Sequence, residues 1–192
     1  GHDKFASVMS GIDAAVDSGI SSIKINSVLM RQYNATELDT FLSWLKHRPV
    51  TIRFIELMQT NDNKDFFDAN HLSGESIKTK LLQRGWQRII QGATAGPAQE
   101  FSHPDYQGNI GLIMPYSNDF CSTCNRLRVS ALGNLHLCLF SEEGISLREH
   151  MNNNSSAELI ALLSRYIKTK KPSHLLQQGN TGITTNLSML GG

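Results

Sequence analysis

Apolar side chains recur at helical spacing from the beginning of the chain. The pattern predicts a helix over roughly Lys4–Asp17, closed by Ser18-Gly19, which is a common C-terminal signal. Its buried face would hold Phe5, Val8, Met9, Ile12, Ala15 and Val16. Because this amphipathic pattern begins so early and without a capping residue, we expect the chain to be a piece of a longer protein.

Two apolar stretches rich in β-branched residues follow, with a second helical pattern between them. Ser22–Met30 and Val50–Met58 predict strands. Between them, Asn34 and Glu37 have the spacing of a capping box. The buried face of the helix that they open would consist of Leu38, Phe41, Leu42 and Leu45. A strand, a helix and a strand at this spacing favour a parallel sheet covered by helices, in an α/β barrel or an open α/β sheet.

The remainder of the chain predicts shorter elements. A polar stretch near residues 59–66 predicts a loop, and Ser73–Arg84 predicts a helix capped by Ser73. Gly133-Asn134 predicts the turn of a hairpin. We expect strands at roughly residues 99–102, 109–114, 126–131 and 135–139, and helices at roughly residues 147–152 and 157–167.

Composition narrows the class of protein. With 192 residues and 40% hydrophobic residues, the chain can bury a core in one domain or two small ones. A formal net charge of +1 creates no global field for nucleic acid or an acidic membrane surface. We find no apolar run long enough to span a bilayer and no secretory signal. Three cysteines cannot all pair with one another, so a reducing cytoplasm and a metal are favoured over a disulfide framework.

All three cysteines lie in one short segment. Two residues separate Cys121 from Cys124, and thirteen separate Cys124 from Cys138. A C-x-x-C pair places two sulfurs on one metal or cluster, and a returning hairpin can add the third. Structural zinc takes four ligands, and His136 could be the fourth because it shares a strand face with Cys138. A three-cysteine iron–sulfur cluster is the alternative, and three buried free thiols are the least favoured interpretation; spacing alone does not separate the two metal sites.

Basic residues beside the cysteines favour a ligand that carries phosphate. In an extended strand Cys124, Arg126 and Arg128 point to the same side. Two guanidinium groups there could bind phosphate through charge-assisted hydrogen bonds, from which a structural zinc site would gain little. Two solvated arginines on a strand surface are the alternative.

Two further basic residues interrupt the apolar strands. Lys24 and Arg53 lie in stretches expected to be buried, where a charge is costly unless it is paired or used. In a barrel, inward polar residues near the C-terminal ends of strands line the active site. Arg53 could instead pair with Glu56 or another carboxylate, and the residues alone leave both interpretations open.

Seven segments resemble one known family. Over essentially its whole length the chain resembles the molybdenum cofactor biosynthesis protein A family, the GTP 3′,8-cyclases. The segments are "GIDAA" (Gly11–Ala15), "KINSVLM" (Lys24–Met30), "RFIELM" (Arg53–Met58), "GPA" (Gly96–Ala98), "FCSTCNRLR" (Phe120–Arg128), "CLF" (Cys138–Phe140) and the terminal "GG" (Gly191-Gly192).

The resemblance implies a radical S-adenosylmethionine enzyme on an incomplete α/β (TIM-like) barrel. In this family a cluster held by C-x-x-x-C-x-x-C near the N-terminus cleaves S-adenosylmethionine, and a second 4Fe-4S cluster, held by three cysteines, binds GTP. The product, 3′,8-cyclo-7,8-dihydro-GTP, passes to cyclic pyranopterin monophosphate synthase in molybdenum cofactor biosynthesis. The implied fold class is α/β. Residues 1–60 would supply the last strands and helices of the barrel, and residues 61–192 a small α+β region with the second cluster and the GTP site.

Site residues are carried over from the family one by one. The match to the second-cluster ligands is Cys121, Cys124 and Cys138. The match to the GTP site is Lys24, Arg53, Arg126, Leu127 and Arg128. Met58 matches a position beside S-adenosylmethionine, and Gly191 and Gly192 match a tail that reaches into the active site.

The chain departs from the family because it contains no C-x-x-x-C-x-x-C. We therefore expect the substrate-binding part of a lyase, without catalytic residues for radical formation and inactive by itself. Expected partners are GTP, the missing N-terminal half, the downstream synthase and a second copy in a homodimer, with no nucleic acid and no membrane. The alternatives are a zinc-stabilised Cys3His binding module and an auxiliary-cluster domain of another radical S-adenosylmethionine enzyme.

Overall fold

The chain divides into two compact units, which we describe one at a time. The first consists of Gly1–Leu57 and Asn70–Met114, and the second of Met58–Ala69 and Pro115–Gly192. The structure is a computed structural model, and it describes residues 3–90, 92, 96–122, 124–141, 143–151, 156–171, 173 and 176–182.

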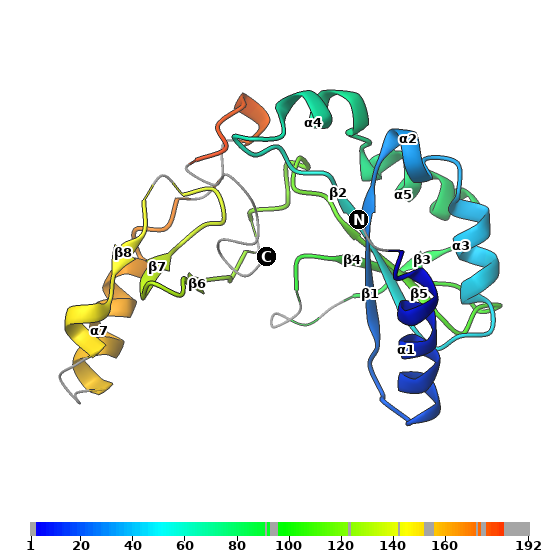
Figure 1. Ribbon diagram of the computed structural model, residues 1–192, viewed down its shortest axis with the longest axis horizontal. Coiled ribbons are helices and arrows are strands. Elements are labelled where there is room, and N and C mark those ends of the chain that lie inside the picture. Colours follow the sequence, from blue (N-terminus) through cyan, green and yellow to red (C-terminus); the bar gives the residue numbers. More distant parts are fainter. Residues whose placement is uncertain are drawn as a thin grey trace. The chain divides into compact units, whose positions relative to one another are not determined.

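The first unit is built on a five-stranded sheet (Figure 1). Its strands are β1 (Lys24–Leu29), β2 (Thr51–Glu56), β3 (Gln87–Arg88), β4 (Gln99–Ser102) and β5 (Asn109–Ile113). In the order β1-β2-β5-β4-β3, the first three strands run parallel to one another, and β4 pairs antiparallel with both β5 and β3. The parallel part confirms the α/β class, and the antiparallel edge makes the sheet mixed.

Helices cover one side of this sheet. They are α1 (Phe5–Asp17), α3 (Leu38–Leu45) and α5 (Gly74–Gln83), and Figure 1 shows α1 and α3 on the same side. The short helix α2 (Arg31–Asn34) follows β1. The core contains the predicted leucines of α3 together with Ile77 and Leu81 of α5 and the strand residues Ile52, Phe54, Phe101, Ile110 and Leu112. α1 contacts this core through Ile12 and Val16, but none of its residues is fully buried, and Phe5 and Val8 at its start are 72% and 54% exposed.

The capping function predicted for Asn34 is wrong. α2 ends at Asn34, and α3 begins after Glu37 with no side-chain cap. Asn34 Nδ2 instead donates to the Val28 carbonyl (2.8 Å), and Asn34 Oδ1 accepts from the Met30 N–H (2.9 Å). The side chain therefore binds the backbone at the end of β1, a neighbour that the spacing of a capping box does not reveal.

The second unit contains a small antiparallel sheet. Its strands are β6 (Arg128–Val129), β7 (Asn134–His136) and β8 (Ile145–Ser146), in that order. The hairpin predicted at Gly133-Asn134 joins β6 to β7, and Gly133 adopts a φ of 76°, which favours glycine. The strands are shorter than predicted because only Arg128 and Val129 of the first arm pair with the second.

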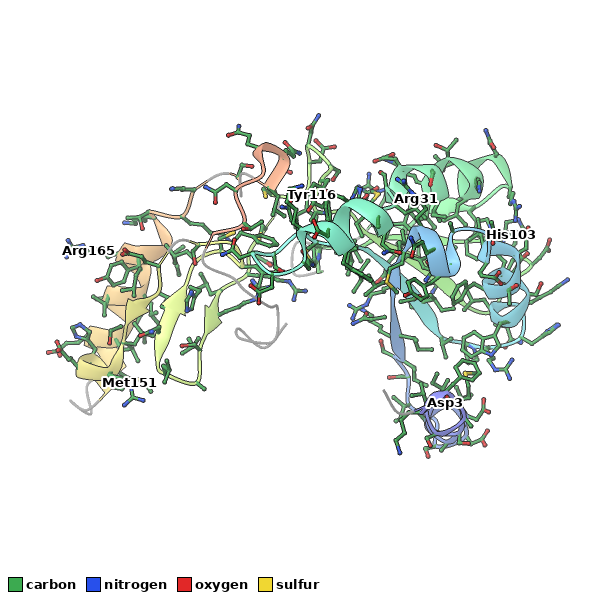
Figure 2. The ribbon with its side chains drawn as sticks, turned by 45° about the horizontal axis from the view of Figure 1, so that its top comes forward. Asp3, Arg31, His103, Tyr116, Met151 and Arg165 are labelled. Carbon is green, nitrogen blue, oxygen red and sulfur yellow. The ribbon has the colours of Figure 1, made fainter. Side chains whose placement is uncertain are left out.

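Four short helices complete the described part of this unit. They are α4 (Lys64–Asn70), α6 (Arg148–Met151), α7 (Ser156–Ile167) and the 3-10 helix η1 (Leu176–Gln178). α4 occupies the end of the stretch predicted as a loop. Its Phe67 packs against Tyr116, labelled in Figure 2, with ring centroids 5.6 Å apart, and the Tyr116 hydroxyl accepts from the Gln59 N–H (3.0 Å). A distant aromatic contact thus stabilises a helix that the polar local sequence did not predict.

Among the described residues, no helix combines the length and the apolar character that crossing a bilayer requires.

The functional division expected at residue 60 stays a prediction. The compact units cut the chain elsewhere, because β5 pairs with β2 and extends the first sheet beyond that point.

Candidate metal centre

Turns and a hairpin end position the three cysteines in the second unit. Cys121 and Cys124 lie in consecutive turns, in which the Ser122 N–H donates to Asp119 O (3.2 Å) and the Cys124 N–H to Cys121 O (3.1 Å). Cys138 follows β7, and its sulfur accepts from the Phe140 N–H (3.5 Å). All three side chains are half-buried free thiols.

The pKa of Cys138 responds to burial and to the two other thiols. Burial raises the pKa of Cys138, and negative charge on Cys121 and Cys124 raises it further, whereas the Phe140 N–H and Lys170 act in the opposite direction. Among the described residues, however, no three His, Cys, Asp or Glu side chains converge closely enough to hold a single metal ion. The thiols therefore influence one another electrostatically, and within the described part of the chain they do not form a closed site for one ion.

The arginines after Cys124 lie in different surroundings. The extended strand assumed for Cys124–Arg128 is wrong, because β6 begins only at Arg128. Arg128 is half-buried. Its pKa is lowered first by burial and then by the positive charge of Arg126, whereas Cys138 and Cys124 raise it. Arg126 is exposed, and Leu127 between them is 38% exposed. Arg128 therefore interacts electrostatically with two of the thiols, whereas the strand geometry that predicted this holds only in part.

His136 is occupied inside the hairpin. It is 6% exposed, and its Nδ1 lies 3.3 Å from Ser141 Oγ. The opposite ring edge lies against Gly144, where an added Cβ would be 2.7 Å from His136 Nε2. Burial, and then Arg128, lower its pKa. These contacts engage both edges of the ring within the hairpin, so they do not favour His136 as a fourth ligand beside the cysteines.

Lys170 is a neighbour of the cysteines that the sequence did not reveal. Its Nζ donates to Cys124 O (2.9 Å) and Arg126 O (2.9 Å) and lies 3.4 Å from Cys124 Sγ. In the sequence it is one member of the run "KTKK" (residues 168–171), and a run of lysines usually indicates a solvated surface. No local signal distinguishes it from Lys168 and Lys171.

Lys24 and Arg53 share one face of the sheet in the first unit. Asn26, Arg53, Gly111 and Glu100 are register partners in a row across β1, β2, β5 and β4. Arg53 Nε donates to Asn26 Oδ1 (2.9 Å), and its stem crosses Gly111, where a Cβ would lie 2.9 Å from Arg53 Cγ. Lys24, two residues before Asn26, pairs with Glu100 at 3.6 Å and is 44% exposed. Arg53 and Lys24 therefore each have a polar partner, Asn26 and Glu100 respectively, on a face of the sheet that solvent can reach.

The alternative partner considered for Arg53 lies on the other face of β2. Glu56 is 1% exposed, and its Oε1 accepts from the Gly74 N–H (2.6 Å) and the Ser73 hydroxyl (3.1 Å). Residues three apart in a strand point to opposite faces, so Glu56 faces the helices. Its position at the start of α5 was not predicted.

The remaining predicted site residues are placed only in part. Met58 follows β2, is half-buried, and accepts at its carbonyl from Asn63 Nδ2 (3.0 Å). Gly191 and Gly192 lie outside the described residues. The structure therefore places the three cysteines and both arginines in the second unit and Lys24 with Arg53 in the first, and their roles at a site stay predictions.

Comparison with known proteins identifies the family. Residues 50–176, which include all three cysteines, match the family described as Molybdenum Cofactor Synthesis C. The chain belongs to this family. Similar curated proteins, each called GTP 3′,8-cyclase, come from Pectobacterium atrosepticum and Yersinia pestis (both 55% identical) and Cronobacter sakazakii (53%). Each comparison covers 100% of this chain and 59% of the relative, so the chain spans about three fifths of their length. The family resemblance noted in the sequence is thereby confirmed.

Proposed function

We propose that the chain is the GTP-binding part of a GTP 3′,8-cyclase. The observation that carries the proposal is that three free thiols interact electrostatically with one another and with the cationic side chains of Arg128 and Lys170, of which Lys170 contacts Cys124 directly. It occurs in a chain that is 53–55% identical, over its whole length, to proteins with that name.

A 4Fe-4S cluster on Cys121, Cys124 and Cys138 suits this set of side chains. A single zinc ion needs all of its ligands about 2.0–2.3 Å from one point, whereas the thiolates of a cluster bind different irons. Three thiols that influence one another electrostatically without converging on one ion are compatible with the wider spacing of cluster ligands. When bound, such a cluster supplies an iron with an open coordination position for GTP.

The chain's own residues would bind and orient the nucleotide. Arg126 and Arg128 would hold the triphosphate through charge-assisted hydrogen bonds, and the partial burial of Arg128 strengthens such a contact. Leu127, which is 38% exposed between them, offers an apolar surface.

We assign the parallel strands β1 and β2 to the last part of an incomplete barrel. Their pairing and the helices on one side are consistent with that architecture. Lys24 and Arg53 would then point to the barrel interior and toward the nucleotide, and Met58, just after β2, would lie beside S-adenosylmethionine.

Formation of the radical is assigned to the part of the relatives that this chain does not cover. The chain has three cysteines, and one cluster uses all of them. We therefore expect no cyclised product and no 5′-deoxyadenosine from this chain alone. We also propose that Gly191 and Gly192 belong to a tail that reaches into the active site. The product would pass to the downstream synthase, and the protein would form a homodimer.

Anaerobic reconstitution tests the proposal. With iron and sulfide, the chain should bind about four irons on the cubane interpretation. Cys124→Ser should lower the iron content, whereas Ser122→Ala, in the same turn, should not, because Ser122 Oγ donates only to the Asp119 carbonyl (2.7 Å) among its described contacts. Stoichiometric uptake of zinc with refusal of iron and sulfide would contradict the cluster and favour the zinc-stabilised module.

A further inference from the structure

Lys170 is held in place at the C-terminal end of α7. Its N–H donates to Ile167 O (3.1 Å), and the preceding Thr169 closes the same turn through its N–H and its hydroxyl, both donated to Tyr166 O (2.9 and 2.8 Å). Lys170 is half-buried, whereas Lys168 and Lys171 are exposed. The side chain thus leaves a closed turn and points inward.

The ammonium group of Lys170 has a contact for each of its three protons. It donates to Cys124 O and Arg126 O, both at 2.9 Å, and lies 3.4 Å from Cys124 Sγ. All three acceptors belong to the segment Cys124–Arg126, which is 44–46 residues away in sequence. That segment carries one thiol and one arginine of the proposed site and lies before β6, so no strand pairing holds it.

We propose that Lys170 is a positioning residue of the cluster site: it fixes the segment Cys124–Arg126 and raises the reduction potential of a cluster bound there. This inference rests on the proposed function of the three cysteines. Two hydrogen bonds to carbonyls orient the backbone, and the third contact places a positive charge against the Cys124 sulfur.

The sign of the effect follows from charge. Reduction adds an electron, and a cation close to a ligating sulfur stabilises the more negative state. Hydrogen bonds to the sulfurs, net charge and exposure are the factors by which a protein sets cluster potentials. Removing the cation should therefore lower the potential, and removing the two carbonyl contacts should loosen the segment.

The experiment compares Lys170→Met and Lys170→Arg with the exposed control Lys168→Met. Midpoint potentials of the reconstituted chains are measured by redox titration with electron paramagnetic resonance, and amide hydrogen exchange of residues 122–128 is measured on the metal-free chains. Lys170→Met should change the equilibrium between oxidation states about tenfold, which lowers the potential by about 59 mV for one electron. In the metal-free Lys170→Met chain, the amide hydrogens of residues 122–128 should exchange about tenfold faster than in the parent. Lys170→Arg should restore most of the potential but less of the protection, because a planar guanidinium cannot repeat the three contacts.

Two results would overturn the inference. One is a Lys170→Met chain whose exchange and potential both equal those of Lys168→Met. The other, should Lys170→Met not fold, is a Lys170→Gln chain with the parent's potential and exchange. Parent protein that takes up no iron would instead contradict the proposed function, and exchange in the metal-free chains would still decide whether Lys170 holds the segment.

Discussion

Arg126 and Arg128 are two residues apart, yet their surroundings differ. Arg128 is half-buried beside Cys124 and Cys138, whereas Arg126 is exposed. A guanidinium that has already lost part of its hydration interacts more strongly with phosphate than one in open water. Burial therefore predicts a stronger phosphate contact for Arg128 than for Arg126, although the sequence alone does not distinguish the two.

We predict that Arg126→Ala and Arg128→Ala each weaken GTP binding by roughly tenfold to a hundredfold, with the larger loss for Arg128→Ala. Isothermal titration of the reconstituted chain with GTP measures this, together with iron content, which should stay normal because no thiolate is lost. Arg126→Lys should rescue only in part, since an ammonium cannot make a bidentate contact. The control is Arg165→Ala, an exposed position on α7 labelled in Figure 2. Parent-like affinity in both alanine variants would place the nucleotide site elsewhere.

His71 should make the stability of the first unit depend on pH. Burial lowers its pKa, Arg31 nearby acts in the same direction, and Glu56 opposes them. The unfolded chain then binds more protons than the folded one as the pH falls below about 6.5, so stability present above that pH is lost on acidification. We predict a shallower slope of the free energy of unfolding between about pH 7 and 5 in His71→Gln than in the exposed control His47→Gln. Equal slopes in urea denaturation would show that His71 does not contribute.

At the scale of elements, α5 is anchored to the sheet by a carboxylate. Ser73 caps the helix as predicted, with its hydroxyl accepting from the Glu75 N–H (3.3 Å). Glu56, from the buried end of β2, reaches the same helix start and accepts from Gly74 and Ser73. A negative group at a helix N-terminus is stabilised by unpaired N–H groups and by the helix dipole. The strand thus holds the helix by charge as well as by apolar packing.

Glu56→Ala should lower the free energy of unfolding by about 2–3 kcal/mol, because it leaves the buried Gly74 N–H without this acceptor. Glu75→Ala in the first turn of α5 is the control, since its contact with Lys78 is a surface ion pair worth at most about 1 kcal/mol. Denaturant unfolding of the metal-free chains gives both values. Similar losses in the two variants would mean that Glu56 does not anchor the helix.

At the scale of the whole molecule, the first sheet has β1 at one edge. Asn34 binds the backbone at the end of that strand, through Val28 O and Met30 N–H. The side chain of Val28 is 38% exposed, and an edge strand with exposed apolar residues favours pairing with another chain.

We therefore predict that the chain forms dimers or larger species, and that Val28→Lys shifts them toward monomer because an edge charge opposes strand pairing. Sedimentation velocity at rising concentration measures the distribution. Val8→Lys changes another exposed valine, on helix α1 rather than on a sheet edge, and should leave association unchanged. A parent chain that sediments as a monomer at high concentration would rule out this edge as an interface.

The sequence by itself determined the features that depend on near neighbours. The helical periodicity before Ser18-Gly19, the Ser73 cap and the turn at Gly133 need only contacts within a few residues, so local patterns predicted them. The spacing of the cysteines and the segments around them likewise indicated the family. These signals do not depend on how distant parts of the chain pack.

Tertiary structure alone decided which polar side chains bind which partners. Asn34 could cap its own helix or bind β1, and α4 forms where Phe67 meets Tyr116. Glu56 reaches α5, and Lys170, alone of its lysine run, turns inward to Cys124. Each of these outcomes depends on a group far away in the sequence that offers a hydrogen bond or an apolar surface in a buried place, where an unmet polar group is costly. Residue type and local periodicity do not reveal which distant group a side chain will contact.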